Sequence, residues 1–300
     1  MNETIYSING AIVPADKATI PVSDRGFLYG DGLFETLHAY GGKLFRMREH
    51  LKRLSDGAAH LYFNPPPDTR LMARWLQAAV RNASFPEANV RITLTRGSGP
   101  RGPSIKGEFQ PTVVISATRF ARPSESRFTQ GVVAIMASFR RQEAAINAGF
   151  KTMNYIEKIL AKREADHAGA DEALLLNNAG LLCEGSASNI SLNRKGTLFI
   201  PDPKRSGALP GIAQLTALKA AGIIKIPIVI TSLSKWDLER CDEAFLSGSM
   251  REITPLIQID GKSIGGAKPG PITRRLIATY RQIIERECKP YKYAKKVNSQ

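Results

Sequence analysis

Residues 149–192 read GFKTMNYIEKILAKREADHAGADEALLLNNAGLLCEGSASNISL, and this stretch carries the clearest structural signals in the chain. Its first part predicts a helix beginning at Lys151, which would place Lys151 and Tyr155 four residues apart on one face. The apolar run 172–177 and the turn residues that follow it predict a hairpin. The second strand of that hairpin ends at Glu184. Two ionisable side chains are thus interleaved with a helix and a hairpin.

Lys151 has apolar neighbours in the sequence. A lone lysine is most often a solvated surface charge. Here Phe150, Met153 and Ile156 lie close along the chain. An amine held in apolar surroundings has a lowered pKa and becomes a nucleophile that can form a Schiff base with a carbonyl. These neighbours shift the balance toward a reactive amine.

Glu184 precedes the small residues of the segment 185–189, Gly-Ser-Ala-Ser-Asn. Small residues let the backbone approach a ligand closely. For an isolated glutamate, however, the more common partner is solvent or a lysine on a loop. On the residues alone, both interpretations of Glu184 stay open.

Two motifs in this stretch carry a resemblance to a known family. The pattern Lys-x-x-Asn-Tyr at 151–155, followed by Glu-Gly-Ser-x-Ser-Asn at 184–189, resembles the fold-type IV, class-IV aminotransferase family of pyridoxal 5'-phosphate enzymes. That family includes branched-chain aminotransferases, D-amino acid aminotransferases and 4-amino-4-deoxychorismate lyases. The resemblance extends over nearly the whole chain, from residues 6–10 to residues 269–273. It implies a two-lobed fold of the α+β or α/β class, with pyridoxal 5'-phosphate as cofactor.

The resemblance also implies a role for individual residues. Lys151 would be the catalytic Schiff-base lysine, and Glu184 would keep the pyridine nitrogen of the cofactor protonated. Tyr155 would bond the ring oxygen. In the segment 49–54, Glu-His-x-x-Arg-Leu, the arginine would hold the cofactor phosphate, although by pattern alone it is equally a surface cation. The full set of implied cofactor-binding residues is Arg53, Tyr155, Glu184, Ser188, Ile212, Ala213 and Ser249.

The phosphate-binding segment departs from the family pattern. The family has Gly-Ile-Thr-Arg where this chain has Gly-Ile-Ala-Gln at 211–214. Backbone N–H contacts at a helix start survive that change, whereas a threonine hydroxyl and an arginine charge are lost. Ser249 lies in a further family segment, at 245–254. Outside that context it would be an ordinary turn serine.

The substrate side of the site is expected from two other segments. The stretch 23–36, which contains several glycines, resembles a family segment whose end lines the substrate side of the cofactor. Phe34 and Thr36 are therefore candidates for lining the substrate pocket. The D-amino acid branches have a tyrosine at the position of Phe34. Arg91 and Arg101 are candidates for binding a substrate carboxylate, with a solvated arginine as an equally weighted alternative.

Residues 97–102, Gly-Ser-Gly-Pro-Arg-Gly, match the dinucleotide-binding pattern G-x-G-x-x-G. That pattern must open a helix, but Pro103 and the polar residues 104–107 continue as a loop, so we reject a dinucleotide site. The loop resembles that of the lyase and D-amino acid branches. The D-amino acid enzymes have a histidine at the position of Pro103, which is a second departure from that branch.

The remaining periodicity predicts two lobes. We expect a small N-terminal α/β domain over residues 1–119, an interdomain linker at 120–130 and a larger C-terminal domain over 131–300 that carries Lys151. Apolar residues at helical spacing predict helices over 47–62, from about 71 to 80, and from about 271. A hairpin is expected at 5–13 and strands at 19–22, 90–96, 111–116, 132–137 and 197–200.

Composition limits the class of protein. The chain of 300 residues is 43% hydrophobic and 23% charged, which is typical of a globular protein. No apolar run has the length of a membrane span, and the N-terminus lacks the features of a secretion signal. The cysteines, 3 in number and far apart, fit neither a disulfide framework nor a metal site. We therefore expect a cytoplasmic protein without a bound metal.

The net charge of +15 raises nucleic-acid or membrane-surface binding as a different class of function. No recognisable nucleic-acid-binding motif accompanies it, and attraction of anionic substrates is a milder explanation. We expect no nucleic acid and no membrane among the partners. The family resemblance implies instead amino acid and 2-oxo acid substrates and a homodimer or higher homo-oligomer.

Three functions remain in competition at this point. The pattern as a whole favours an aminotransferase that moves an amino group between an amino acid and a 2-oxo acid. The segments 95–102 and 34–36 suggest 4-amino-4-deoxychorismate lyase, which releases pyruvate and 4-aminobenzoate. A basic, non-enzymatic binding protein would leave the surroundings of Lys151 and Glu184 unexplained.

Overall fold

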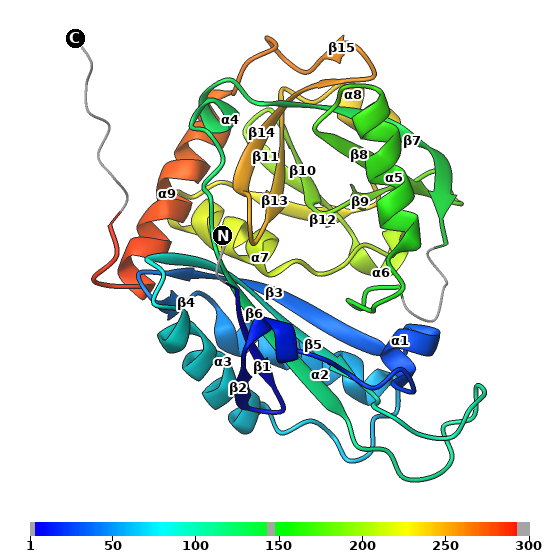
Figure 1. The fold of residues 1–300 in the computed structure, drawn as a ribbon. Helices are drawn as coiled ribbons and strands as arrows, with labels where there is room; N and C mark the ends of the chain where they lie inside the picture. Colours follow the sequence, from blue (N-terminus) through cyan, green and yellow to red (C-terminus); the bar gives the residue numbers. More distant parts are fainter. Residues whose placement is uncertain (1–3, 143–147, 293–300) are drawn as a thin grey trace.

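The computed structural model describes residues 4–142 and 148–292, and it contains two sheets (Figure 1). The first is six-stranded and antiparallel, with the order β2-β1-β6-β5-β3-β4. Its long central strands carry apolar side chains toward the core on alternate positions. Its strands are β1 (Ile5–Ile8), β2 (Ala11–Val13), β3 (Gly32–Tyr40), β4 (Lys43–Leu44), β5 (Glu87–Thr95) and β6 (Thr112–Arg119).

Two helices, α2 (Met47–His60) and α3 (Thr69–Ala83), pack on one face of this sheet. The side chain of Asp68 caps α3 by accepting from the backbone N–H groups of Arg70 and Leu71. The apolar stripes of both helices bury leucine and alanine side chains against β3, β5 and β6. The 3-10 turn η1 (Ala15–Lys17) and the short helix α1 (Arg25–Tyr29) connect β2 to β3.

The second sheet is nine-stranded, with the order β12-β11-β10-β13-β14-β7-β8-β9 and with β15 paired to β14. Parallel and antiparallel pairs are mixed in it, since β7 runs parallel to both β14 and β8. Its strands are β7 (Val132–Arg141), β8 (Glu172–Asn177), β9 (Leu182–Gly185), β10 (Asn189–Arg194), β11 (Thr197–Pro201), β12 (Ile228–Thr231), β13 (Glu243–Gly248), β14 (Glu252–Ile259) and β15 (Lys262–Ser263).

Helices cover this second sheet as well. The long helix α9 (Pro271–Glu287) packs beside α7 (Ile212–Ile223), and α5 (Ile156–His167) packs on β7 and β8. Figure 1 shows α9 along one side of the molecule and α5 near the opposite side. The remaining helices are short: α4 (Ser126–Thr129), α6 (Pro203–Ser206) and α8 (Lys235–Glu239). Within the described ranges, no helix combines the length and the hydrophobicity of a membrane span.

Aromatic side chains of the first sheet region join the core of the second. Tyr40 and Phe45 are buried in the same hydrophobic cluster as Phe245 and the apolar face of α9. The hydroxyl of Tyr40 also donates to Glu252 Oε1, at 2.9 Å. The two sheets are therefore connected through packed side chains and a buried hydrogen bond.

Most predicted elements are present, but two are wrong. Residues 19–22 form no strand. Lys151 does not begin a helix, because α5 starts only at Ile156. The Lys151 carbonyl instead accepts from Phe34 N at 3.0 Å, and Thr152 pairs with Leu33 as an isolated β-bridge. The segment is extended because the start of β3 offers it backbone hydrogen bonds, which helical periodicity does not reveal.

Candidate active site

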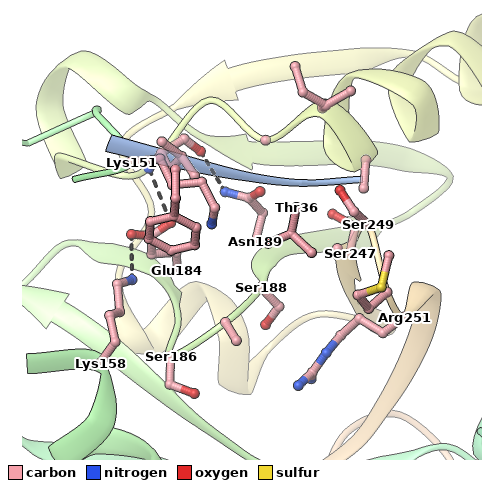
Figure 2. A pocket seen from close by; sticks show the side chains of 18 of the residues that line it. Thr36, Lys151, Lys158, Glu184, Ser186, Ser188, Asn189, Ser247, Ser249 and Arg251 are labelled. Atoms are coloured by element: carbon pink, nitrogen blue, oxygen red, sulfur yellow. Dashed lines mark hydrogen bonds and ion pairs between the residues drawn. The ribbon is translucent and has the colours of Figure 1, made fainter. Parts of the chain in front are cut away.

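A cavity of about 370 Å³ lies where the two sheets face each other. Its walls come from β3, α2 and β5 on one side and from β9, α7 and the residues after β13 on the other. Figure 2 shows Lys151, Glu184 and Ser249 around this cavity, with Thr36 between them. A concave site of this size is suited to a small ligand.

Lys151 reaches the cavity from its extended segment. Its Nζ lies 4.7 Å from the ring centroid of Phe34 and 5.7 Å from that of Tyr155. Burial lowers the pKa of Lys151 to about 8, although the negative charge of Glu35 opposes this shift. The predicted apolar surroundings are thus present, and a sizeable fraction of the amine is neutral near pH 8.

Glu184 is the penultimate residue of β9 and is buried at the same cavity. Its Oε1 accepts from Lys158 Nζ at 2.6 Å and from the guanidinium of Arg141, and its Oε2 accepts from Leu209 N at 3.1 Å. The partners are therefore largely buried cations on α5 and β7, and neither bulk solvent nor a loop lysine fills that role. Because a carboxylate has about four acceptor positions, these three bonds leave one for a ligand.

Arg53 projects from α2 and is held by Glu35 of β3. Its Nε and Nη2 each lie 2.7 Å from a Glu35 oxygen, and its Nη1 donates to Pro210 O at 2.7 Å. Burial opposes ionisation of Glu35, but the Arg53 charge and the bond from His50 outweigh it and lower the pKa of Glu35 to about 2. Since a guanidinium has five N–H groups, two remain for an anion in the cavity.

The start of α7 forms the neighbouring wall. Gly211 is its N-cap residue and no side chain caps the first turn, so the free N–H groups of that turn face the cavity. A Cβ on Gly211 would lie 1.8 Å from Asn189 Oδ1, so a side chain there would displace Asn189. Ile212, Ala213 and Ser249 line the cavity, and Arg53 is bonded to Pro210, which directly precedes Gly211. Free helix N–H groups beside a cation suit a phosphate group.

The predicted substrate residues are only partly brought together. Phe34, Thr36 and Arg91 line the cavity. The guanidinium carbon of Arg91 lies 3.6 Å from the Phe34 ring centroid, and burial lowers the pKa of Arg91. Arg101, in contrast, is exposed on its loop and does not line this cavity.

Comparison with known proteins identifies the family. The family model described as amino-transferase class IV matches residues 32–259, which include every cavity-lining residue. The chain belongs to the class IV aminotransferase family. Its expected enzyme class, its fold-type IV architecture and pyridoxal 5'-phosphate as its cofactor are thereby confirmed.

Three relatives illustrate the likeness. A putative branched-chain-amino-acid aminotransferase of Methanocaldococcus jannaschii is 34% identical, over 92% of this chain and 95% of that protein. The structure of the branched-chain aminotransferase from Thermoproteus uzoniensis with norvaline has a TM-score of 0.87 and 31% identity, covering 96% of this chain and 97% of that one. The 4-amino-4-deoxychorismate lyase structure from Pseudomonas aeruginosa has a TM-score of 0.83 and 32% identity, covering 92% of this chain and 98% of that one.

The cavity of this aminotransferase fits its cofactor chemically. A buried amine with a lowered pKa is present for the carbonyl, and an acceptor position on Glu184 is present for the pyridine nitrogen. The uncapped first turn of α7 and the cation of Arg53 suit the phosphate. Tyr155, packed edge-on against Phe34 at 5.1 Å between centroids, adds a hydroxyl to the same cavity.

Sequence reasoning missed several charged residues of the site. Lys158 and Arg141 bind Glu184, and Glu172 accepts the hydroxyl of Ser188 at 2.8 Å. Arg251 lines the cavity and pairs with Glu172. The sequence does contain one signal of this network: Glu172 is a charged residue at the start of an otherwise apolar strand. Its partner Arg251, 79 positions further along the chain, could not be found from spacing.

Proposed function

We propose that this enzyme transfers an amino group between an amino acid and a 2-oxo acid with Lys151 as its catalytic lysine and Glu184 as the partner of the cofactor ring. The observation that carries the assignment is the meeting of these two residues at one cavity, although they come from different elements of the fold. The anion-binding end formed by Arg53 and α7 supports a cofactor oriented by its phosphate.

The proposed roles follow from what each group can do. Pyridoxal 5'-phosphate supplies a carbonyl for the amino group and a ring that accepts electrons from the substrate's α-carbon. Lys151 Nζ would carry the proton between that carbon and the cofactor, which requires the neutral amine that burial favours. Glu184 would hold a proton at the ring nitrogen, and Tyr155 Oη would donate to the ring oxygen.

The binding residues divide into two groups. We assign the phosphate to Arg53, Ser249 and the backbone of Ile212 and Ala213, since all four line the cavity and Arg53 is bonded to Pro210 just before α7. Ser188 contributes to the cofactor side through its bond to Glu172. Phe34 and Thr36 would form the substrate wall, and Arg91 would bind the substrate's α-carboxylate.

The stereochemical preference belongs to the proposal as well. Phe34 and Pro103 both depart from the pattern of the D-amino acid branch, and the relative from M. jannaschii is named as a branched-chain aminotransferase. We therefore infer L-amino acids as the donors. An amino-donor screen with 2-oxoglutarate and pyruvate, using both enantiomers, tests this choice, and turnover of D-amino acids alone would contradict it.

Lyase activity is the second candidate function. It is favoured by the P. aeruginosa lyase structure and by the loop at residues 95–102. The two activities differ in one requirement, because a transaminase needs an oxo-acid acceptor and the lyase releases pyruvate from aminodeoxychorismate without one. Turnover that depends on the acceptor supports amino transfer, and pyruvate release in its absence supports the lyase.

The lysine assignment is tested by Lys151→Ala. This substitution should abolish turnover and the absorbance near 400 nm that a cofactor bound to the lysine gives. Unchanged spectra would contradict the assignment. Lys52→Ala is a suitable control, because Lys52 is exposed on α2.

We also propose that the enzyme acts as a homodimer or higher homo-oligomer. Arg101 lies on an exposed loop outside its own cavity, so its expected role in substrate binding requires the cavity of a partner chain. Light scattering should give at least twice the chain mass. A monomer with full activity would contradict this proposal.

A cytoplasmic location completes the proposal. It is supported by the cysteines, because Cys183, Cys241 and Cys288 are buried thiols that form no disulfide with one another. Fractionation of the source cells with an antibody against the enzyme tests it.

A further inference from the structure

Arg251 is a cavity-lining cation that the roles above do not use. It lies in the turn after β13, and its side chain is 18% exposed. Its Cγ lies 3.1 Å from where a Cβ on Gly248 would stand, so the aliphatic part of Arg251 runs over that glycine. In Figure 2 its guanidinium extends away from the hydroxyl of Ser249 and toward Ser188. The charge of Arg251 therefore lies away from the proposed phosphate end.

Glu172 fixes the orientation of this guanidinium. Arg251 Nη1 lies 3.0 Å from Glu172 Oε2, and the Glu172 side chain is fully buried. The same carboxylate accepts from Ser186 N at 3.0 Å, from the Ser186 hydroxyl and from the Ser188 hydroxyl. A carboxylate with this many donors holds its position firmly, and it holds Arg251 by one edge.

The pair is more than a structural ion pair. Glu172 already has hydroxyl and backbone donors, so its burial does not depend on Arg251 alone. Arg251 keeps part of its surface toward the cavity, and one bond to Glu172 leaves further N–H groups on the guanidinium. The neighbouring floor of the cavity consists of the small residues Ser186, Ala187 and Ser188, which leave room for a ligand group.

We propose that Arg251, held by Glu172, binds the second carboxylate of a dicarboxylic amino or 2-oxo acid. The inference rests on the proposed function, because it takes the α-carboxylate to be bound by Arg91. Arg91 comes from β5 and Arg251 from the turn after β13, so two guanidinium groups enter the cavity from different sheets. A planar fork suits a carboxylate, and a dicarboxylate offers one to each arginine.

The test compares the binding of two unreactive acids to the cofactor-loaded enzyme by calorimetry. Glutarate carries two carboxylates, and pentanoate has the same number of carbons with one. In Arg251→Met, the ratio of glutarate affinity to pentanoate affinity should fall about tenfold or more, the loss expected for a charge-assisted hydrogen bond in a partly buried site. Arg274→Ala, which removes an exposed arginine on α9, should leave the ratio unchanged.

A second variant separates a loss of carboxylate binding from a loss of stability. Removal of Arg251 alone leaves the charge of Glu172 buried without its cation, which can destabilise the protein. The double variant Glu172→Gln with Arg251→Met removes both charges, and it should show the same fall in the ratio. Arg251→Lys keeps the charge without the fork and should give an intermediate ratio.

Two results would overturn the inference. An unchanged ratio in both Met variants would show that Arg251 does not bind the second carboxylate. Loss of the cofactor's absorbance in these variants would assign Arg251 to the cofactor instead. Since neither binding nor absorbance requires turnover, failure of the proposed amino transfer would appear separately, in the acceptor-dependent assay.

Discussion

Two largely buried lysines, Lys151 and Lys158, line the same cavity, and their contacts separate their roles. Lys158 Nζ donates to Glu184 at 2.6 Å and to Gly185 O at 3.1 Å. Lys151 Nζ lies instead over the rings of Phe34 and Tyr155. Burial lowers the pKa of both amines. Lys151 is the better nucleophile of the two, because its nitrogen is not held by a carboxylate.

The pKa of Lys151 leads to a prediction about pH. Burial lowers this pKa to about 8, so the amine of the cofactor-free enzyme should lose its proton as the pH rises through about 8. Competitive labelling with acetic anhydride, followed by mass spectrometry, measures the neutral fraction at each pH. The exposed Lys52 provides an internal reference. If the labelling of Lys151 and of Lys52 rose with pH in the same way between pH 7 and 10, burial would not lower the pKa of Lys151.

At the scale of elements, Glu35 connects β3 to α2 through Arg53 and His50. Its pKa of about 2 lies below the unfolded value, so its ionised form stabilises the fold above pH 4.5. Glu35→Gln should lower the free energy of unfolding by about 3 kcal/mol at pH 7, because Arg53 keeps its charge without its partner.

The sign of this effect can be checked with pH. As the pH falls from 4.5 toward 2, Glu35 becomes protonated in the wild type and its advantage is lost. Urea unfolding of both proteins between pH 7 and pH 3 should therefore show the difference shrinking at the acid end. A difference that stays constant would mean that the charge of Glu35 contributes nothing.

The first turn of α7 gives a prediction about cofactor affinity. In Gly211→Ala the new Cβ would displace the Asn189 side chain, whose amide donates to Leu209 O at 2.7 Å. Binding of pyridoxal 5'-phosphate to the cofactor-free protein should weaken about tenfold, or about 1.4 kcal/mol. Fluorescence titration measures this affinity.

Gly222→Ala is the matched control in the same helix. A Cβ there meets nothing within 4 Å, so this substitution should stabilise α7 by about 0.5–1 kcal/mol and leave cofactor affinity unchanged. Equal loss of affinity in both variants would mean that the start of α7 has no special role.

Some elements of the fold and the site could be predicted from the sequence, and others could not. The hairpin that carries Glu184 was predictable, because its strands and its turn are local patterns. The extended backbone at Lys151 could not be predicted from local patterns. It depends on backbone hydrogen bonds to β3, which lies more than a hundred residues earlier in the chain. The family motifs located the cavity residues, whereas the pairs of Arg251 with Glu172 and of Arg141 with Glu184 exist only after the second sheet has formed.

At the scale of the whole molecule, the cavity depends on how the two sheets are held together. We propose that these sheets are the cores of the two lobes expected on either side of residues 120–130. Tyr40 and Glu252 join the sheets directly. Tyr40→Phe keeps the ring packing and removes the donor, so the free energy of unfolding should fall by about 1 kcal/mol in urea titrations.

Tyr62→Phe is the control for this contact, since Tyr62 is 76% exposed. It should leave the stability within about 0.5 kcal/mol of the wild type. Equal stability of all three proteins would mean that the buried hydroxyl of Tyr40 does not help to hold the sheets together.

The positive net charge of the chain has the same sign as the net charge of the residues that line the cavity. The cavity is lined by six cations and one acid, and the chain carries a net charge of +15. An excess of positive charge attracts ligands that bear phosphate and carboxylate groups. The lining cations are Arg53, Arg91, Arg141, Lys151, Lys158 and Arg251.

The central claim is that Lys151, and not its neighbour Lys158, forms the bond to the cofactor. Borohydride reduction of the cofactor-loaded enzyme makes this bond permanent, and peptide mass mapping then locates it. We expect one phosphopyridoxyl group per chain, on the peptide that contains Lys151. A label on Lys158, or on a lysine outside the cavity, would contradict the account.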